Sequence, residues 1–240
     1  KTPPDFYDYI VVDEFHHAAA PSYQRLLAHY NPKILLGLTA TPERMDGLNI
    51  LEYFNDKVTA EIRLPEAINR KLLAPFHYFG VTDVVDLDSV AWRRGAYDPI
   101  ELSRVYTGNR ERVDRIVRAV RDYTTDIRDI IGLGFCVSVE HAEYMAASFQ
   151  EAGIPAACLH AGSSREERST IQRRLVTREI HFIFVVDLYN EGIDLPMVDT
   201  LLLLRPTQSP VLFQQQIGRG LRLAPGKESC LVLDFVGQHR

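Results

Sequence analysis

The chain has 240 residues, of which 46% are hydrophobic and 25% are charged. This composition is close to the globular average and excludes a disordered, collagenous or fibrous chain. The formal net charge of −5 excludes a protein that holds nucleic acid by bulk positive charge, so any phosphate contact must be local. No apolar run approaches the ~18 residues of a membrane helix, so we expect no membrane partner. Cys136, Cys158 and Cys230 lie far apart, and we expect reduced thiols in a cytoplasmic protein.

Short apolar runs recur along the chain, and most are followed by a polar or glycine-containing turn and an amphipathic stretch. This order is typical of α/β proteins with a parallel sheet. Most of the runs are apolar throughout, as expected for parallel strands that are covered on both faces. The predicted strands are Tyr9–Val12, Lys33–Leu38, Asp129–Val137, Ala156–Leu159, His181–Val186, Thr200–Leu204 and Cys230–Phe235.

Helical patterns lie between several of these strands. Residues 112–123 and 140–151 both fit helices packed on a sheet, and Ser138 is a candidate cap for the second helix. Ser164 and Glu167 form a capping box that begins a third helix.

The pattern is looser between residues 64 and 106, where prolines and Gly95 interrupt it and no long periodic run is present. We therefore place a boundary near Ala74. The chain is expected to divide into two parts, residues 1–74 and residues 75–240.

Two carboxylates, Asp13 and Glu14, directly follow the first predicted strand at its carboxyl end. Ligands of open α/β sheets collect at this edge. One carboxylate there can hold Mg²⁺ through water while the other activates a water molecule. A helix cap with a solvated neighbour explains the pair equally well. A third interpretation adds His16 and His17 to form a metal-dependent hydrolase or nuclease centre, but these adjacent histidines have poor ligand spacing.

A helix predicted over residues 211–221 begins after Ser209 and Pro210, which fit its N-cap and first position. At about 100° per residue, its apolar side chains share one sector and its polar side chains cluster opposite. Gly218 and Gly220 each cost about 1 kcal/mol in a helix interior, and close approach of a ligand or another lobe is one reason for them. A solvated helix face is the ordinary reading of paired arginines, but they also suit a transferring phosphoryl group. The apolar sector holds Phe213, Ile217 and Leu221, and the opposite side holds Gln215, Arg219 and Arg222.

Several segments resemble the conserved motifs of superfamily 2 helicases. The segments that resemble motifs II, III, V and VI, in this order, are Asp13-Glu14-Phe15-His16, Thr39-Ala40-Thr41, Asn190-Glu191-Gly192-Ile193-Asp194 and Gln215-Gln216-Ile217-Gly218-Arg219-Gly220-Leu221-Arg222. Residues 134–142 resemble motif IV. Residues 204–210 resemble the bacterial DEAD/DEAH-box branch that is related to the helicase subunits of restriction enzymes.

This resemblance implies an α/β fold with two RecA-like lobes, each a parallel sheet with flanking helices. Residues 1–74 would be the C-terminal part of an incomplete first lobe, and residues 75–240 would be the second lobe. The resemblance also implies that ATP and Mg²⁺ bind between the lobes. A nucleic-acid strand, which the restriction-like branch suggests is DNA, would run across both lobes.

The resemblance implies a role for each matching residue of the first lobe. Asp13 would hold Mg²⁺ through water, and Glu14 would be the general base that positions the attacking water. His16 would connect the nucleotide site with the opposite lobe. Thr39 and Thr41 would couple the state of the nucleotide to lobe movement.

The matching residues of the second lobe would complete the nucleotide site. Gly192 and Asp194 would line the nucleotide cleft, and Gln215 would sense the phosphates. Arg219 and Arg222 would be arginine fingers, which contribute about 10³ to 10⁵ in rate where such fingers have been removed.

One further segment resembles a nucleic-acid motif, and one position departs from the family. His160 and Gly162, after the fourth predicted strand, resemble a motif that contacts a nucleic-acid backbone, although a plain strand-to-helix turn fits nearly as well. Val186 stands where many relatives carry a threonine that contacts phosphate.

The family's P-loop, Gly-x-x-x-x-Gly-Lys-Ser/Thr, is absent from the 240 residues. Residues 220–227 are a false match, because five residues separate the two glycines and Glu228 replaces the hydroxyl residue. We expect the P-loop and the first strands of the lobe upstream of Lys1, as a missing N-terminal partner segment. The parent protein is then expected to be a nucleic-acid-dependent ATPase that acts as a helicase or translocase. The alternative is that the 240-residue chain alone is a non-catalytic binding module for nucleic acid or protein.

Overall fold

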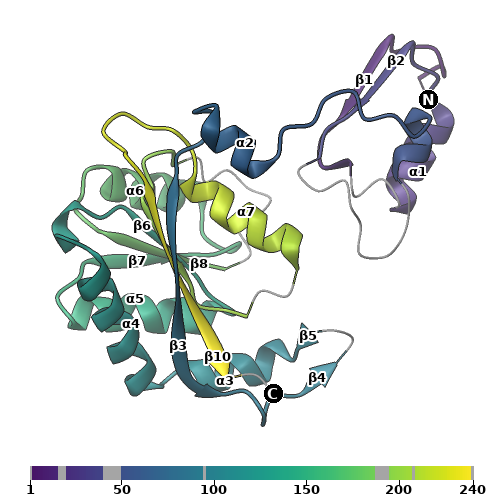
Figure 1. Ribbon diagram of the computed structural model, residues 1–240. Helices are drawn as coiled ribbons and strands as arrows, with labels where there is room; N and C mark the ends of the chain where they lie inside the picture. The colour runs from purple at the N-terminus through teal and green to yellow at the C-terminus, as the bar shows by residue number, and fades with distance from the viewer. Residues whose placement is uncertain are drawn as a thin grey trace. The chain divides into compact units, whose positions relative to one another are not determined.

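The structure, a computed structural model, describes residues 2–15, 20–39, 50–93, 96–186, 195–206 and 209–238. The chain forms two compact units, Lys1–Arg63 and Leu64–Arg240 (Figure 1). The sequence pattern placed the boundary later, near Ala74. The difference arises because Leu64 already packs against the core of the second unit, and the Ala74 amide donates to the carbonyl of Leu221 at 2.7 Å.

The first unit contains a two-stranded parallel sheet. β1 (Tyr9–Val12) pairs with β2 (Ile34–Gly37), and α1 (Pro21–His29) lies between them in the chain. A short 3-10 helix, η2 (Ile50–Phe54), follows in the sequence. The prediction of both strands is confirmed, although β2 is one residue shorter at each end than expected.

The two faces of this small sheet differ in exposure. Val12 and Phe15 are buried in a core with Ile50. Gly37 leaves room for the ring of Phe54, which would lie 2.6 Å from a Cβ at that position. Because side chains alternate along a strand, the opposite face presents a different set of side chains, and these are apolar and exposed. They are Tyr9, Val11, Ile34, Leu36 and Leu38, each at least 43% exposed.

The second unit is built on a six-stranded sheet in which every neighbouring pair of strands is parallel. The strand order is β3-β10-β9-β6-β8-β7. Three central strands, β6, β8 and β9, are buried at every position, which explains their unbroken apolar sequence. The predicted parallel α/β architecture is therefore confirmed. The strands are β3 (Phe76–Asp86), β6 (Gly132–Phe135), β7 (Ala156–Leu159), β8 (Phe182–Val185), β9 (Thr200–Leu203) and β10 (Cys230–Gln238).

Helices cover both faces of this sheet (Figure 1). α4 (Arg110–Tyr123) and α5 (Val139–Glu151) contribute to the hydrophobic core on one face. α6 (Arg165–Val176) and α7 (Pro210–Gly220) contribute to the core on the other face. Short helix α2 (Leu64–Asn69) precedes β3. Within the described ranges, no helix has the length and apolar character needed to cross a bilayer.

Two glycines on β6 make room for aromatic side chains from the neighbouring strand β8. A Cβ at Gly132 would lie 2.3 Å from the ring of Phe182, and a Cβ at Gly134 would lie 2.4 Å from the ring of Phe184. Both rings pack against Phe149 of α5, with centroids 5.2 and 4.8 Å apart. These glycines therefore allow α5 to pack closely on the sheet.

Serine side chains begin three of the helices, as the sequence predicts. The hydroxyl of Ser138 accepts from the amide of His141 at 3.1 Å, and Ser164 accepts from Glu167 at the same distance. Ser209 accepts from the amide of Leu212 at 3.4 Å. Each hydroxyl satisfies an amide that has no partner inside its helix.

The region from residue 64 to residue 106 is more regular than its sequence suggests. Besides α2 and β3, it contains an antiparallel hairpin of β4 (Trp92–Arg93) and β5 (Ala96–Tyr97), followed by α3 (Pro99–Tyr106). β3 escaped prediction because it is an edge strand, exposed over much of its length, and the buried Asp83 interrupts its apolar pattern.

A buried charged cluster joins several elements of the second unit. Arg112 of α4 is 1% exposed, and its Nε donates to Asp83 of β3 at 2.7 Å. Its terminal nitrogens donate to Nε2 of His141 at 3.1 Å and to the carbonyl of Leu204 at 2.9 Å. The guanidinium carbon lies 3.8 Å from the ring centroid of Tyr106. A guanidinium can only donate, so His141 is neutral here. Burial, and then the Arg112 charge, hold the pKa of His141 well below its usual range.

We predict that this cluster makes the chain less stable in mild acid. The imidazole of His141 stays neutral in the folded state, whereas in the unfolded chain it takes up a proton near pH 6.5. The stabilisation is complete above that pH and is lost below it, by up to about 1.4 kcal/mol per pH unit. Urea unfolding between about pH 7.5 and 5.5 measures this slope.

The matched variants are His141→Gln, which keeps an acceptor for Arg112, and His77→Gln at an exposed position. The first should flatten the dependence of the unfolding free energy on pH, and the second should leave it as in the wild type. An equal slope in all three proteins would contradict the assignment of a neutral, buried His141.

Candidate functional site

The carboxylate pair lies at the carboxyl end of the small sheet. Asp13 and Glu14 directly follow β1, and Thr39 follows β2 after Leu38. The amide of Leu38 donates to the carbonyl of Val12 at 2.9 Å, and the amide of Phe15 donates to Leu38 at 2.8 Å. The two strand ends therefore stay paired beyond the sheet, and this pairing brings the carboxylates and Thr39 to one edge.

Glu14 has an uncommon backbone conformation. Its φ is 51°, in the left-handed region that non-glycine residues rarely adopt. Its amide donates to Oδ1 of Asp13 at 2.9 Å, which fixes the two residues relative to each other. Asp13 is exposed and Glu14 is half-buried. Backbone strain of this kind is often found at functional sites.

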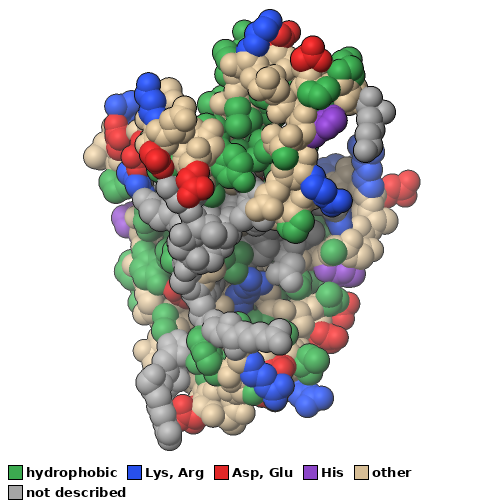
Figure 2. Space-filling view, turned by 90° about the vertical axis from the view of Figure 1, so that its right-hand side faces the viewer, with side chains coloured by type: hydrophobic (Ala, Val, Ile, Leu, Met, Phe, Trp, Pro, Cys, Tyr) green, Lys and Arg blue, Asp and Glu red, His purple; other side chains and the backbone are tan. Residues whose placement is uncertain are grey.

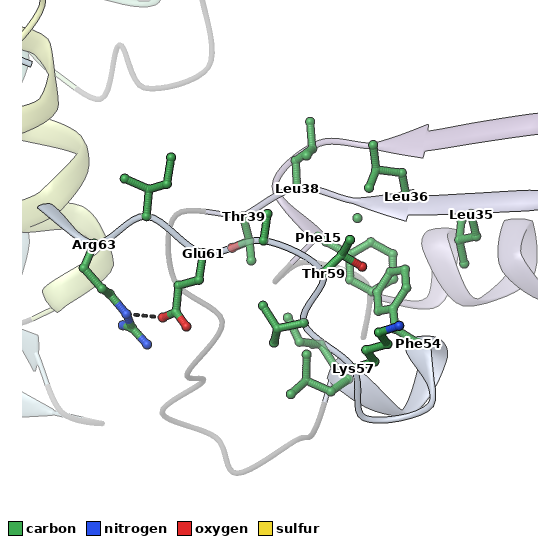
Figure 3. Close-up of a pocket in the computed structure, with 16 residues that line it drawn as sticks. Phe15, Leu35, Leu36, Leu38, Thr39, Phe54, Lys57, Thr59, Glu61 and Arg63 are labelled. Atoms are coloured by element: carbon green, nitrogen blue, oxygen red, sulfur yellow. Dashed lines mark ion pairs between the residues drawn. The ribbon is translucent and has the colours of Figure 1, made fainter. Parts of the chain in front are cut away.

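A pocket of about 340 Å³ opens beside this strand end in the first unit (Figure 3). Thr39 and Phe15 line it on the side of the sheet, and residues 57–63 line the other side. In Figure 3, Glu61 and Arg63 form an ion pair at its edge. Asp13 and Glu14 are not among the lining residues. The pocket is therefore distinct from the carboxylate pair, and Thr39 connects the two places.

Helix α7 has the orientation that its sequence predicts. Ile217 and Leu221 are 3% and 1% exposed in the sheet-side core, and Phe213 packs against that core. The expected polar side does not enter the core. Gln215 and Arg219 of this side are half-buried, and so is Arg222, which lies two residues after the end of the helix.

The two glycines of α7 have different surroundings. A Cβ at Gly220 would lie 2.5 Å from Sγ of Cys230 and 2.8 Å from Leu201, so a side chain there would separate the helix from β9 and β10. A Cβ at Gly218 would meet no described atom within 4 Å. Close approach thus explains Gly220, and the approached surface is the sheet of the same unit.

The sequence analysis missed one polar residue of α7. Gln216 is completely buried, although the residue before it in the proposed motif, Gln215, is only half-buried. The signal was present in the helical period, because Gln216 lies three residues after Phe213 and four before Gly220, on the side that faces the sheet. A buried polar side chain at this position is a structural part of the motif.

The loop after β7 is held by its own hydrogen bonds. The amide of Gly162 donates to Nδ1 of His160 at 3.1 Å, and Arg168 donates to the carbonyls of His160 and Ala161 at 3.3 and 2.8 Å. Since Nδ1 accepts, a neutral His160 carries its proton on Nε2, where it can donate. The exposed Gly162 and this donor fit a phosphate contact, and they also fit a plain strand-to-helix turn.

Several predicted positions lie outside the described residues. They are His16, Thr41, Gly192 and Asp194, together with His17 of the metal-centre interpretation. Among the residues that are described, no group of three or more His, Cys, Asp or Glu could hold a metal ion. Val186 is described and is 8% exposed in the core, so its side chain cannot replace the phosphate contact of a threonine.

Charge on the visible face of the molecule is mixed. Figure 2 shows Lys and Arg side chains interspersed with Asp and Glu side chains. This distribution agrees with the net charge of −5.

Two family models match the chain. The model of the helicase conserved C-terminal domain matches residues 110–224, which include Arg219 and Arg222. The model of the type III restriction enzyme res subunit matches residues 1–44, which include Asp13 and Glu14. The restriction-enzyme model thus matches the first unit, and the helicase model matches the second unit.

Individual proteins agree with these models. IRC3 of Saccharomyces cerevisiae, which its name describes as an ATP-dependent helicase, is 28% identical over 95% of this chain and 34% of its own length. A solved fragment assigned to the HsdR subunit of a type I restriction enzyme from Vibrio vulnificus YJ016 has a TM-score of 0.71 at 22% identity, covering 97% of this chain and 44% of that chain. The ATP-dependent type ISP restriction-modification enzyme LlaBIII, solved bound to DNA, has a TM-score of 0.67 at 18% identity and covers 98% of this chain and 18% of that chain.

The fold, the motifs and these matches agree on one class, the helicases built on RecA-like parallel sheets. The models and relatives together support a superfamily 2 helicase fragment, similar to subunits of restriction enzymes. It spans half or less of the length of the curated relatives it matches, 49% and 34% for two of them.

The packing of α7 gives a matched pair of substitutions. Gly220→Ala should lower the free energy of unfolding by about 1–3 kcal/mol, because the new methyl group meets Cys230 and Leu201. Gly218→Ala should be neutral or stabilising by up to about 1 kcal/mol, because alanine favours helices and has space there. Urea unfolding of the two variants checks this, and equal effects at both positions would show that α7 does not pack on the sheet as described.

Proposed function

We propose that this chain carries part of the ATP-hydrolysing machinery of a DNA helicase or translocase of the restriction-enzyme type. The observation that carries the proposal is the placement of Asp13 and Glu14 at the carboxyl edge of β1, next to Thr39. In the part that matches the helicase C-terminal domain, Arg219 and Arg222 are half-buried and lie outside the hydrophobic core of the second unit. Carboxylates and arginines together are what phosphoryl transfer requires.

In the first unit, the proposed chemistry assigns one task to each carboxylate. The exposed Asp13 would hold Mg²⁺ through water, and its carboxylate oxygens are the hard ligands that this ion prefers. Bound Mg²⁺ would neutralise charge on the phosphates. Glu14 would orient the attacking water and accept its proton, and its bond to Asp13 would fix it in place. His16 would connect this site with the opposite lobe, and Thr39 and Thr41 would couple nucleotide state to movement.

In the second unit, the proposed chemistry is electrostatic. Arg219 and Arg222 would stabilise the negative charge that spreads over the transferring phosphoryl group. Gln215, on the same side of α7, would sense the phosphates, and Gly192 and Asp194 would line the nucleotide cleft. Nucleic acid would contact the His160 and Gly162 loop at the carboxyl end of β7.

The proposal requires a P-loop, which the 240 residues do not contain. Backbone amides and a lysine must cradle the β- and γ-phosphates for tight ATP binding. We propose that an N-terminal segment of the same lobe supplies them. The exposed apolar face of β1 and β2 supports this, because further secondary structure packed there would bury it. Reading the encoded protein upstream of Lys1 tests this requirement, and a P-loop is expected within about one lobe's length, roughly a hundred residues.

The catalytic proposal is tested by Glu14→Gln in the longer protein that contains this chain. The amide cannot accept a proton, so hydrolysis of ATP stimulated by DNA should fall on the order of 10²- to 10⁴-fold. The exposed Glu52→Gln, a matched change in the same unit, should leave the rate unchanged. Normal turnover in Glu14→Gln would end the proposal.

A second candidate concerns the 240-residue chain by itself. The absence of a P-loop from its sequence favours a binding module without catalysis. Isothermal titration calorimetry of this chain with ATP and Mg²⁺ should show weak binding or none, since the amides and lysine that hold phosphates are not present. Hydrolysis of ATP by this chain alone would overturn this candidate.

A further inference from the structure

Donors from outside the helix hold the C-terminal end of α7. Helices end with carbonyl groups that lack partners within the helix. Here Nζ of Lys227 donates to the carbonyl of Gly220 at 2.6 Å and to that of Arg222 at 2.9 Å. The carbonyl between them, Leu221, accepts from the amide of Ala74 at 2.7 Å. Three consecutive carbonyls, which include that of one predicted arginine finger, are thereby fixed.

Lys227 also reaches a third segment. Its Nζ donates to the carbonyl of Pro196 at 3.0 Å. Pro196 lies two residues after Asp194 in the sequence, just beyond the motif V-like segment, and its neighbour Leu195 is buried in the core. Lys227 therefore connects the C-terminal end of α7 with Pro196, which follows the segment predicted to line the nucleotide cleft. An ammonium group has three donors, and these three carbonyls use all of them.

The ammonium group of Lys227 binds backbone carbonyls and not a phosphate. Residues 220–227 superficially resemble a P-loop, but the ammonium at the end of this stretch is occupied by backbone carbonyls of its own unit. The group is half-buried, and burial lowers the pKa of Lys227 from its ordinary value. The positive charge also lies at the C-terminal end of α7, where the helix dipole favours a cation.

We propose that Lys227 is a positioning residue for Arg219 and Arg222. It fixes the end of α7, which carries Arg219, and the main chain of Arg222 just after it, against the segment that follows the motif V-like residues. Both guanidinium groups are thereby presented in one orientation to the phosphates. This inference rests on the proposed function for its kinetic consequence. The clasp itself, defined as the three contacts of Lys227 with Gly220, Arg222 and Pro196, does not depend on it.

The kinetic test uses the longer protein that contains this chain. Lys227→Met keeps the length of the side chain but removes its charge and donors. Because misplaced groups act on the transition state more than on ATP binding, kcat should fall on the order of 10- to 100-fold, while KM for ATP stays within about threefold. Lys227→Arg keeps a charged donor and should restore much of kcat. Lys71→Met, an equal change of charge at an exposed position of the same unit, should have no effect.

A structural measurement separates this proposal from the proposed function. In the 240-residue chain, hydrogen exchange of the amides of residues 218–222 should become faster in Lys227→Met and stay unchanged in Lys71→Met. Faster exchange in Lys227→Met together with a normal kcat would overturn the positioning role. Lys227 would then only cap the end of α7. Unchanged exchange would overturn the clasp. If the wild-type longer protein hydrolyses no ATP, the proposed function fails, and with it the kinetic role of Lys227, while the exchange measurement still decides whether the clasp exists.

Discussion

Parallel strand pairing is the constraint on which the site depends. In the β1-β2 sheet and in the six-stranded sheet, the ladder of main-chain hydrogen bonds aligns the strands in one direction, so that all the carboxyl ends meet at one edge. In the first unit the pairing continues past the last strand residues, through Leu38 and Phe15. Asp13, Glu14 and Thr39 are neighbours because of these backbone bonds, and not because their side chains attract one another.

The second unit uses the same constraint to support a rigid helix. α7 lies on β9 and β10, and Gly220 allows an approach that no side chain at that position could match. Ile217 and Leu221 anchor the helix in the core, while Lys227 and Ala74 hold its end. The backbone that carries Arg219 is already fixed, so only the side chain would lose conformational freedom when it meets a ligand. This is the physical reason why a glycine-rich helix can be a precise element of a phosphate site.

The sequence predicted those parts of the fold in which local pattern and tertiary environment agree. The buried strands β6, β8 and β9 are apolar at nearly every position, and serine caps mark the starts of α5, α6 and α7. β3 was missed because its exposed edge position and its buried Asp83 hide the strand pattern. The charge of Asp83 is balanced by Arg112, which is distant in the sequence, and no local rule connects the two.

The packing of α7 was predictable from the sequence, but the contacts that hold its end were not. The sectors of α7 followed from helical period alone, and the burial of Ile217 and Leu221 agrees with them. The role of Lys227 could not be predicted, because it depends on carbonyl groups that only the folded chain brings to one point. The roles of the acidic pair and of the arginines in ATP hydrolysis stay predictions.

The proposed function requires that the carboxylates of the first unit and the guanidinium groups of the second act on one triphosphate. The most direct measurement is a crystal structure of the longer protein with ADP, Mg²⁺ and aluminium fluoride, which mimics the transferring phosphoryl group. The account predicts that Glu14 faces the water opposite the leaving group and that Arg219 or Arg222 donates to the fluoride ligands. Guanidinium groups directed away from the nucleotide, with Glu14 remote from that water, would contradict it.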